Sequence, residues 1–518
     1  MSVGVVIKRS AIFVHRWLGV ALCVLFLLWF PSGIGMMYWG FPGVTAADRL
    51  ERAVPLDPAA IRLSPAEAYA TLGLIEPPTQ VRLNTFDGRP VYRFRDADGE
   101  SMVYADTGAQ QIDVPEAMRH RIAAAWARQP AADAQVDAVT EIDQWTVGGG
   151  LRTLRPLWKY AWPSGDEVYL AGATGEVVQY TTTASRLGAY VGAIPHWFYF
   201  TPLRKHQVTW SQVVIWTSGV GTVASILGVI VGIWMYSPRK RYRYAGVPTS
   251  IPYRGQKRWH TLFGLIFGLG AVTWAFSGML SMDPFPEPTG GPSARPDAGR
   301  RPAGIAQALR GRAPMTAFAA KDPRVALQQI GRGDVRELEF TALAGEPVYF
   351  ATLADGESRI VPLASAPIAA LDEPRILELV SRALQPDTIV EATRLEAYDA
   401  YYIDRRRERP LPVIRVKVDD EAQTRYYIDP KSGRVVSTYG AGSWVNRWLY
   451  HGLHSLDFPW LYNYRPLWDI VVITFMVGGT ALCVTSLILA WRVLGRTLAR
   501  ARPGRRPRAS EDLVMETE

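Results

Sequence analysis

The chain has 518 residues, 48% of them hydrophobic, and a formal net charge of +9 at pH 7. This length allows several domains. Four apolar runs reach the roughly 20 helical residues needed to cross a bilayer core, which excludes a purely water-soluble protein. The runs are Trp17–Trp39, Val213–Tyr236, Leu262–Met282 and Leu467–Trp491.

Basic residues gather beside these runs. Lys8, Arg9 and Arg16 precede the first run, and the 237–258 segment carries seven Lys or Arg residues and no acidic residue. The positive-inside rule therefore predicts that both termini and this segment are cytoplasmic. The lipid bilayer accounts for the basic excess, and we expect no nucleic-acid partner.

Two long loops then lie on the other side of the membrane, roughly 40–207 and 283–466, and we expect each to be α+β. Ser64 followed by proline and glutamate is a typical helix start. Residues 90–108 alternate around an Asp-Gly pair, which predicts a hairpin. Related strand-turn-strand units recur at 167–178, 347–361 and 425–436.

The two cysteines, Cys23 and Cys483, both fall inside predicted spans. The exported loops therefore have no disulfide framework. We interpret the buried thiols as small packing residues.

Four of the seven histidines form two pairs at constant offsets. His15 and His260 begin the first and third spans, 245 positions apart (260 − 15), and Trp29 and Trp274 keep the same offset. His196 and His454 precede the second and fourth spans, 258 positions apart (454 − 196). Such matching predicts paired ligation of a group between the halves, with haem iron the leading candidate, because bis-imidazole ligation suits electron transfer.

The chain resembles the PepSY-associated transmembrane (PepSY-TM) family from about Lys8 to Arg496. The resemblance rests on the His-Arg-Trp-Leu-Gly opening at His15, on helix-plus-hairpin units ending in Asp-x-x-x-Gly-x-Val-Val, and on the histidines before the second and fourth spans. It implies a membrane α-helical fold of four transmembrane helices in a pseudo-twofold repeat, with two periplasmic α+β PepSY-like domains.

On this reading the chain has ten segments in order. They are a cytoplasmic N-terminus (1–16), a first span (17–39), a PepSY-like domain whose pre-span helix carries His196 (40–207), a second span (208–236), a basic cytoplasmic loop (237–258), a third span (259–282), a Pro/Gly-rich linker (283–304), a second PepSY-like domain whose pre-span helix carries His451 and His454 (305–466), a fourth span (467–492) and a basic cytoplasmic tail (493–518).

The family includes inner-membrane ferric-siderophore reductases that carry haem in the membrane part. The resemblance therefore implies an inner-membrane oxidoreductase with two haem b groups, one at His15/His260 and one at His196/His454. Electrons would come from a cytoplasmic flavin reductase or a quinol, because no nucleotide-binding fingerprint is present. The substrate would be a periplasmic ferric siderophore, whose iron is released on reduction because hard oxygen ligands hold ferrous iron weakly.

A second hypothesis comes from another class of protein. The exported units can be read as PepSY binding or regulatory modules, for a protease or a metal complex, anchored by the helices and without redox activity. That reading gives no reason for histidines matched across both halves. Haem content separates the two hypotheses.

Other residues have alternative roles. His451, three residues before His454, can replace it as a ligand or contact a propionate or the substrate. Trp29 and Trp274 can stand between the two haems, although packing is the simpler account. We interpret the remaining candidates as packing, helix-approach or surface residues: Met37 and Met282, Ser32-Gly33 and Ser277-Gly278, His120, His206 and the run Arg405-Arg406-Arg407.

Overall fold

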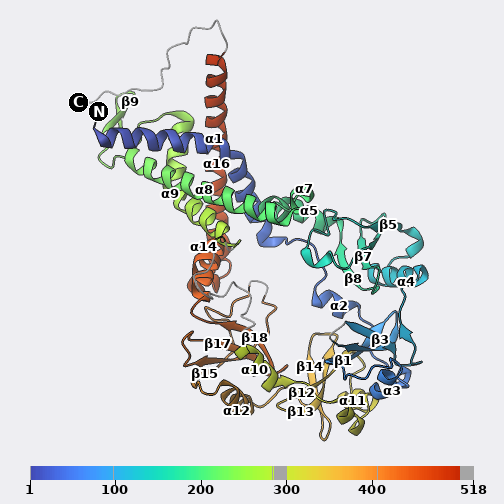
Figure 1. Cartoon of the computed structure of the whole chain (residues 1–518). Coiled ribbons are helices and arrows are strands. Elements are labelled where there is room, and N and C mark those ends of the chain that lie inside the picture. The colour runs from blue at the N-terminus through green and yellow to red at the C-terminus, as the bar shows by residue number, and fades with distance from the viewer. Residues whose placement is uncertain (1, 97–98, 283, 285–299, 405–406, 502–518) are drawn as a thin grey trace.

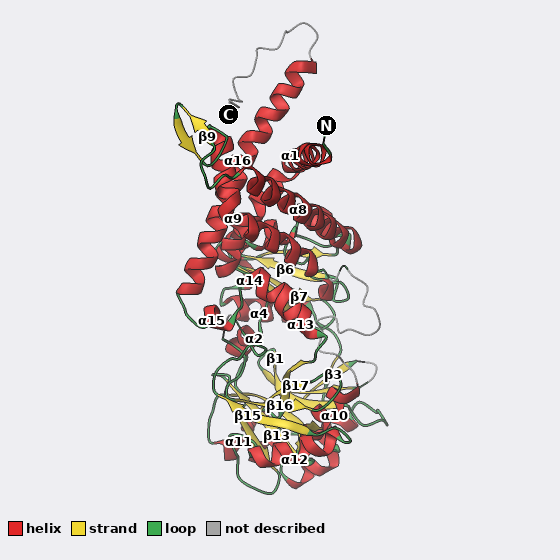
Figure 2. Ribbon diagram, turned by 90° about the vertical axis from the view of Figure 1, so that its left-hand side faces the viewer, coloured by secondary structure: helices red, strands yellow, loops and turns green. Residues whose placement is uncertain are grey.

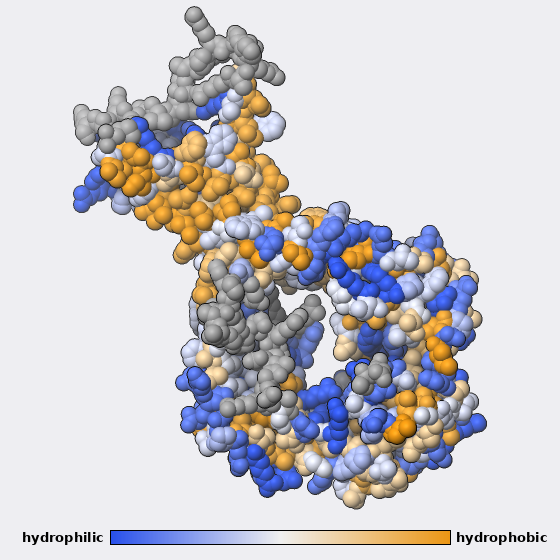
Figure 3. Space-filling model, viewed as in Figure 1, coloured by the Kyte–Doolittle hydropathy of each residue, from blue (hydrophilic) through white to orange (hydrophobic). Residues whose placement is uncertain are grey.

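The computed structural model describes residues 2–96, 99–282, 284, 300–404 and 407–501. It has a helical bundle at one end and sheet-bearing modules at the other (Figure 1). The surface of the bundle is mostly hydrophobic and that of the modules mixed and more hydrophilic (Figure 3). Four bundle helices are long and apolar enough to cross a membrane: α1 (Val3–Tyr38), α8 (Gln207–Met235), α9 (Gly255–Leu280) and α16 (Leu467–Ala501).

The first of these helices differs from its predicted bounds. α1 begins at Val3 rather than at Trp17, because no proline or glycine pair interrupts the stretch before the apolar run. Pro31 lies inside α1, at a point where the missing N–H removes one helical hydrogen bond. The other three helices begin within a few residues of their predicted starts.

The bundle is a ring in which α1 packs on α8 and α16, and α9 packs on the same two helices. Between α8 and α9 the chain forms a short hairpin of β9 (Tyr242–Tyr244) and β10 (Val247–Thr249). Ala245 and Gly246 both have positive φ, at 46° and 80°, as a two-residue hairpin turn requires. We call this the hairpin end of the bundle, and the opposite end the sheet end.

The two long loops share one eight-stranded antiparallel sheet, which we call the joint sheet. Its strand order is β14-β13-β12-β1-β2-β3-β4, with β11 also paired to β12. The strands are β1 (Gln80–Phe86), β2 (Arg89–Arg95), β3 (Glu100–Tyr104), β4 (Gln110–Gln111), β11 (Arg310–Gly311), β12 (Val335–Leu343), β13 (Glu346–Leu353) and β14 (Ser358–Pro362).

The joint sheet was not expected from the sequence, which predicted separate units in each loop. Its two parts meet where β1 pairs with β12, with Val81 opposite Phe340. Each strand covers the unpaired backbone groups that the other would leave at a sheet edge. The two loops are therefore joined through one continuous sheet.

Each loop also has a four-stranded sheet of its own. Figure 2 shows β6 and β7 of the first sheet nearer the bundle than β15, β16 and β17 of the second. The first sheet has the order β5-β6-β7-β8 and the second β15-β16-β17-β18. All four predicted hairpins are confirmed as paired strands. The strands are β5 (Gln135–Val139), β6 (Leu157–Ala161), β7 (Glu167–Ala171), β8 (Val177–Thr181), β15 (Ile389–Leu395), β16 (Val413–Val418), β17 (Arg425–Asp429) and β18 (Arg434–Tyr439).

Helices cover these sheets, and the predicted helix start at Ser64 is confirmed by a capping box with Glu67. The covering helices are α2 (Ala46–Arg52), α3 (Pro65–Ala70), α4 (Glu116–Ala127), α10 (Arg300–Leu309), α11 (Pro323–Ile330) and α12 (Glu373–Leu384).

Short helices connect the modules to the spans. Before α8 lie α5 (Thr183–Val191), α6 (Ala193–Trp197) and α7 (Thr201–Arg204). Before α16 lie α13 (Ser443–Val445), the π-helix η5 (Asn446–Gly452), α14 (Leu453–Ser455) and α15 (Pro459–Tyr462). Most of the predicted linker 283–304, two residues of the Arg405–Arg407 run and the tail from 502 lie outside the described residues.

Candidate functional site

His15 and His260 meet at the hairpin end of the bundle. His15 lies on α1 and His260 near the start of α9, and their ring centres are 6.2 Å apart with the planes inclined by 33°. Both histidines are carried by spanning helices. The matched offset in the sequence therefore corresponds to a spatial pair, which we call the hairpin-end pair.

His196 and His454 form a second pair at the sheet end. Their ring centres are 6.0 Å apart and their planes inclined by 67°. Neither lies on a spanning helix: His196 is on α6, which packs on α1, and His454 is on α14, which packs on α9. A Cβ on Gly35 of α1 would lie 2.9 Å from the Cα of Gly192, so this contact needs glycine.

Hydrogen bonds fix the proton position in the hairpin-end pair. His15 Nδ1 lies 3.0 Å from the carbonyl oxygen of Ala224. A carbonyl only accepts, so Nδ1 must donate. His260 Nδ1 lies 3.3 Å from Thr485 Oγ1, whose own proton is donated to the Leu482 carbonyl at 2.7 Å. That hydroxyl therefore accepts from His260.

The sheet-end pair has the same arrangement with serines. Ser32 Oγ donates to the Trp29 carbonyl at 3.0 Å and lies 3.2 Å from His196 Nδ1. Ser277 Oγ donates to the Trp274 carbonyl at 3.3 Å and lies 3.0 Å from His454 Nδ1. The two serines keep the 245-residue offset (277 − 32).

The consequence is one tautomer for all four rings. With the proton on Nδ1, the lone pair of each neutral imidazole is on Nε2, the form in which histidine binds a metal. Burial lowers the pKa of His196 to about 4, against a smaller upward effect of its hydrogen bond to the Trp29 carbonyl. This imidazole is therefore neutral near pH 7.

The hairpin-end pair opens into a pocket that is lined by residues of all four spans. Its wall is mainly aliphatic residues and glycines. Gly228 is required there, because a Cβ at this position would lie 2.6 Å from His15 Cε1. The wall includes Val20, Gly228, Val229, Leu482, Cys483 and Leu489.

The sheet-end pair lines a second pocket of about 730 Å³, with a wall rich in aromatic rings. Trp274 Nε1 donates to the backbone carbonyl of His454 at 2.7 Å. The aromatic wall consists of Phe26, Trp29, Phe30, Trp197, Trp210, Trp274 and Tyr450.

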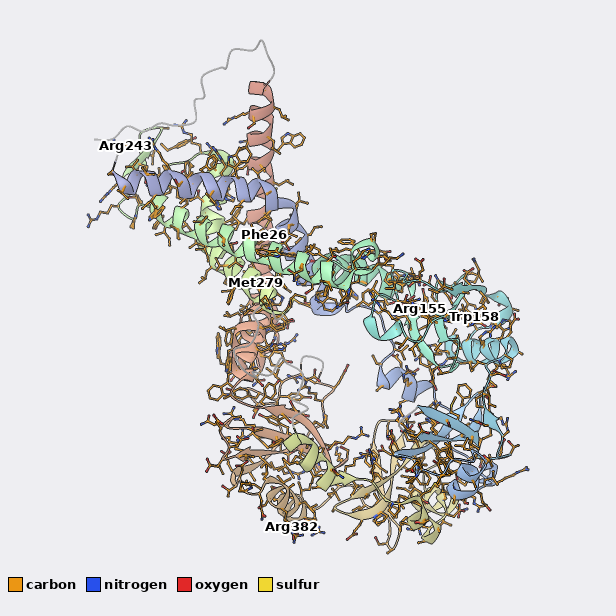
Figure 4. The ribbon with its side chains drawn as sticks, in the orientation of Figure 1. Phe26, Arg155, Trp158, Arg243, Met279 and Arg382 are labelled. Atoms are coloured by element: carbon orange, nitrogen blue, oxygen red, sulfur yellow. The ribbon has the colours of Figure 1, made fainter. Side chains whose placement is uncertain are left out.

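The two pockets share Phe26, Phe30 and Ala271 as wall residues. Phe26 is labelled within the bundle in Figure 4. Trp29 and Trp274 line only the sheet-end pocket. Each contacts a sheet-end histidine there, Trp29 through its carbonyl to His196 and Trp274 through its indole to the His454 carbonyl. Their place between two haems stays a prediction.

The remaining candidates lie away from the pair centres. His451 is on the π-helix, with its ring 4.7 Å from that of Tyr450, and is not among the residues that line the sheet-end pocket. His206 is exposed at the start of α8. His120 lies on α4, and its ring packs against that of Tyr160 on β6. Met282 lines the sheet-end pocket, whereas Met37 packs beside it.

Sequence reasoning missed the hydrogen-bond partners of the pairs. Ser32 and Ser277 had been marked by their offset, but only as helix-approach residues. Ala224 and Thr485 have no sequence signal of their own. Their place beside the histidines follows from helix packing.

Neither pair belongs to a larger metal-binding cluster. Within the described ranges, no three His, Cys, Asp or Glu side chains gather in a way that could hold a metal ion. Each pair therefore offers two protein ligands. A metal bound there would need the rest of its ligands from another group.

The PepSY-associated TM region family matches residues 12–332, which is more than half of the chain. The match covers α1, α8 and α9 and extends to α11. No curated protein matches the chain.

Proposed function

The chain belongs to the PepSY-associated TM family, and we propose that it is an electron-transfer protein that holds haem b at each histidine pair and reduces ferric siderophores. The observation that carries the proposal is the two pairs of imidazoles, each with ring centres about 6 Å apart. All four rings have Nδ1 hydrogen-bonded, which leaves Nε2 as the metal-binding atom.

The ring spacing is one at which both imidazoles of a pair would hold the same metal. Two metal–imidazole bonds of about 2 Å and two ring radii of about 1.2 Å would separate the ring centres by about 6.4 Å. The observed separations are 6.2 Å and 6.0 Å.

The ligand count also favours haem over a bare ion. Each pair would supply two nitrogen ligands, and a porphyrin would supply the other nitrogen ligands of its iron. The sheet-end pair lines a pocket bounded by aromatic side chains. Its tryptophan and phenylalanine wall suits a flat apolar ring system.

Bound haem would supply a one-electron carrier at each pair. The chain's own residues would set its properties. Ala224, Thr485, Ser32 and Ser277 orient the four imidazoles, and such partners typically raise ligand basicity.

The distance between the pairs matches a route across the bundle. His196 contacts the backbone carbonyl of Trp29, and the His454 carbonyl accepts a hydrogen bond from the indole of Trp274. Each tryptophan is 14 residues beyond the matched histidine of the hairpin-end pair, or about 21 Å along a straight helix. We place the electron donor, a cytoplasmic flavin reductase or a quinol, at the hairpin end, beside the basic 237–258 segment. The ferric siderophore would bind on the sheet side, in the periplasm of a cell whose inner membrane holds the bundle.

The spectrum of the purified protein tests the proposal. Protein from haem-replete cells should be red, with a sharp Soret band and about two haems per chain by pyridine haemochrome. A colourless preparation would contradict the electron carrier and favour the anchored binding module. The reduced protein should then be reoxidised by a ferric siderophore, and a reduced protein that is not reoxidised by any ferric chelate would remove the reductase assignment.

Single substitutions test the ligand assignment. His15→Ala or His260→Ala should remove one haem, and His196→Ala or His454→Ala the other. His206→Ala is the matched control, because this histidine is exposed and outside both pockets. If His451→Ala lost a haem and His454→Ala did not, the sheet-end ligand would be His451.

A further inference from the structure

A pocket of about 1560 Å³ lies where the two long loops meet, on the joint sheet and away from the histidine pairs. It is formed at the β1–β12 junction, with α10 and β18 at its side. Both loops contribute wall residues, so the pocket exists only when the joint sheet is assembled. The residues that define its chemistry are Arg95, Arg310, Arg312, Arg434, Glu339 and Phe318.

The charge of this wall is strongly positive. Four arginines face one carboxylate, that of Glu339. Arg310 and Arg434 both bind the same oxygen of Glu339, the second at 3.2 Å. One carboxylate cannot neutralise two guanidinium groups, so an uncompensated charge remains at this point.

Arg310 is held in a fixed position. Its side chain is 8% exposed, Nη1 donates to the Ser432 carbonyl at 3.0 Å, and the guanidinium lies 4.2 Å from the ring centre of Phe350. Burial lowers the pKa of Arg310, and the charge of Glu339 opposes that effect. The group is therefore an ordered cation at the base of the pocket rather than a mobile surface charge.

The other two arginines are also incompletely neutralised. Arg95 lies 3.2 Å from Glu100, but Glu100 also pairs with Arg82 at 2.7 Å and Arg93 at 3.0 Å. Arg312 is exposed, and no residue in the described ranges forms an ion pair or hydrogen bond with its guanidinium. The positive charge of the wall is thus available to a ligand.

We propose that this pocket binds an anion with at least two carboxylate or phosphate groups. Guanidinium groups bind both of these oxyanions through paired N–H donors. One acidic group would pair with Arg312, and a second would reach Arg434 or Arg95. Phe318 supplies an apolar floor for the body of the ligand.

Such a ligand would contact both loops at once. Arg95 belongs to the first loop, whereas Arg312 and Arg434 belong to the second. A compound that binds only the assembled pocket stabilises the junction by mass action. The proposal does not depend on haem or on ferric reduction, because none of these residues lines a histidine pocket.

The test uses the full chain in detergent at low salt. Citrate, pyrophosphate and acetate are titrated by calorimetry, with the thermal unfolding of the sheet modules as a second readout. We expect citrate or pyrophosphate to bind and to raise the unfolding temperature, and acetate, with one carboxylate, to have a much weaker effect. The stronger of the first two ligands identifies which oxyanion the pocket selects.

Two variants decide the location. Arg312→Gln and the double variant Arg312→Gln/Arg434→Gln should weaken the affinity by about tenfold for each charged contact removed. The matched control is Arg382→Gln on α12, an exposed arginine far from the pocket and labelled in Figure 4. Arg382→Gln changes the net charge by the same amount as Arg312→Gln.

Arg312 is exposed and without a protein partner in the described ranges, so its replacement should leave the fold intact. The proposal would be overturned if none of the three anions bound above background. It would also be overturned if Arg312→Gln and Arg382→Gln weakened the binding equally. Haem content, measured in the same samples, should not change in any variant.

Discussion

The two histidine pairs have nearly the same ring spacing but are built differently. At the hairpin end both histidines sit on spanning helices, α1 and α9. At the sheet end both sit on short helices outside the spans. The sheet-end rings therefore need contacts that tie them to the bundle, and Ser32 and Ser277 supply these from α1 and α9.

The walls of the two pockets also differ in the residues that form them. The hairpin-end wall is aliphatic and depends on glycine, since Gly228 packs directly against His15. The sheet-end wall is aromatic, and Trp274 holds the backbone of His454. Steric fit should therefore decide whether haem binds at the hairpin end, and hydrogen bonding should decide whether it binds at the sheet end.

The largest expected change in haem content comes from a steric clash at the hairpin end. In Gly228→Ala, the new methyl group would lie 2.6 Å from His15 Cε1, so the ring must leave the position fixed by Ala224. We expect this variant to lose about one of two haems, measured by pyridine haemochrome. Gly232→Ala, one turn along α8, is the control, because its Cβ would be 3.4 Å from Leu265. Equal haem content in both variants would contradict the steric account.

A smaller effect should separate the hydroxyl partners at the two ends. Ser277→Ala removes the hydroxyl that accepts from His454 Nδ1, and loss of such a partner typically weakens metal binding by about 10–100-fold. Ser32→Ala should have a smaller effect, because the Trp29 carbonyl remains 3.3 Å from His196 Nδ1. Thr485→Val should also cost less than Ser277→Ala, because His260 remains fixed by its place on α9. The rate of haem loss to an acceptor globin measures the effect of the serine variants and of Thr485→Val.

Ser281→Ala is the control for the serines. Ser281 lines the sheet-end pocket, but its hydroxyl donates to the Gly278 carbonyl rather than contacting a histidine. Faster haem loss in Thr485→Val than in Ser277→Ala would reverse the comparison between the two ends.

The sequence was sufficient to find the histidine pairs because the offset recurs along whole helices. Two spans that carry histidine at equivalent positions place these side chains at one level of a bundle. The hairpins could be predicted for a similar reason, since alternation and Asp-Gly turns are local signals. Both kinds of inference depend on residues close together in sequence or kept in register.

The rest depends on contacts between distant segments. The β1–β12 pairing joins residues more than 250 positions apart, as Val81 and Phe340 illustrate, and neither strand carries a mark of its partner. The choice between His451 and His454 was also hidden, because the π-helix at Asn446–Gly452 changes the angle between them. An α-helix would have placed both on one face.

The two repeat-matched helices, α1 and α9, also differ in the residues that lie between the two pockets. Phe26 and Phe30 fill the space between the pockets, and at the 245-residue offset their counterparts are Ala271 and Ala275. Phe30 packs on Gly479 and Phe26 on Gly221. One pair of rings fits between the helices where two pairs would collide, so the sequence repeat must break here.

The smallest expected effect concerns the two tryptophans, which the offset makes equivalent and the hydrogen bonds do not. Trp274→Phe removes the indole donor to the His454 carbonyl, at a cost of about 1 kcal/mol. Trp29→Phe should cost less, because the contact of Trp29 with His196 is made by its backbone carbonyl, which phenylalanine keeps. The temperature at which the sheet-end haem is released should therefore fall further for Trp274→Phe. An equal fall in both variants would mean that ring packing, which the two tryptophans share, holds His454 in place and that the indole hydrogen bond does not.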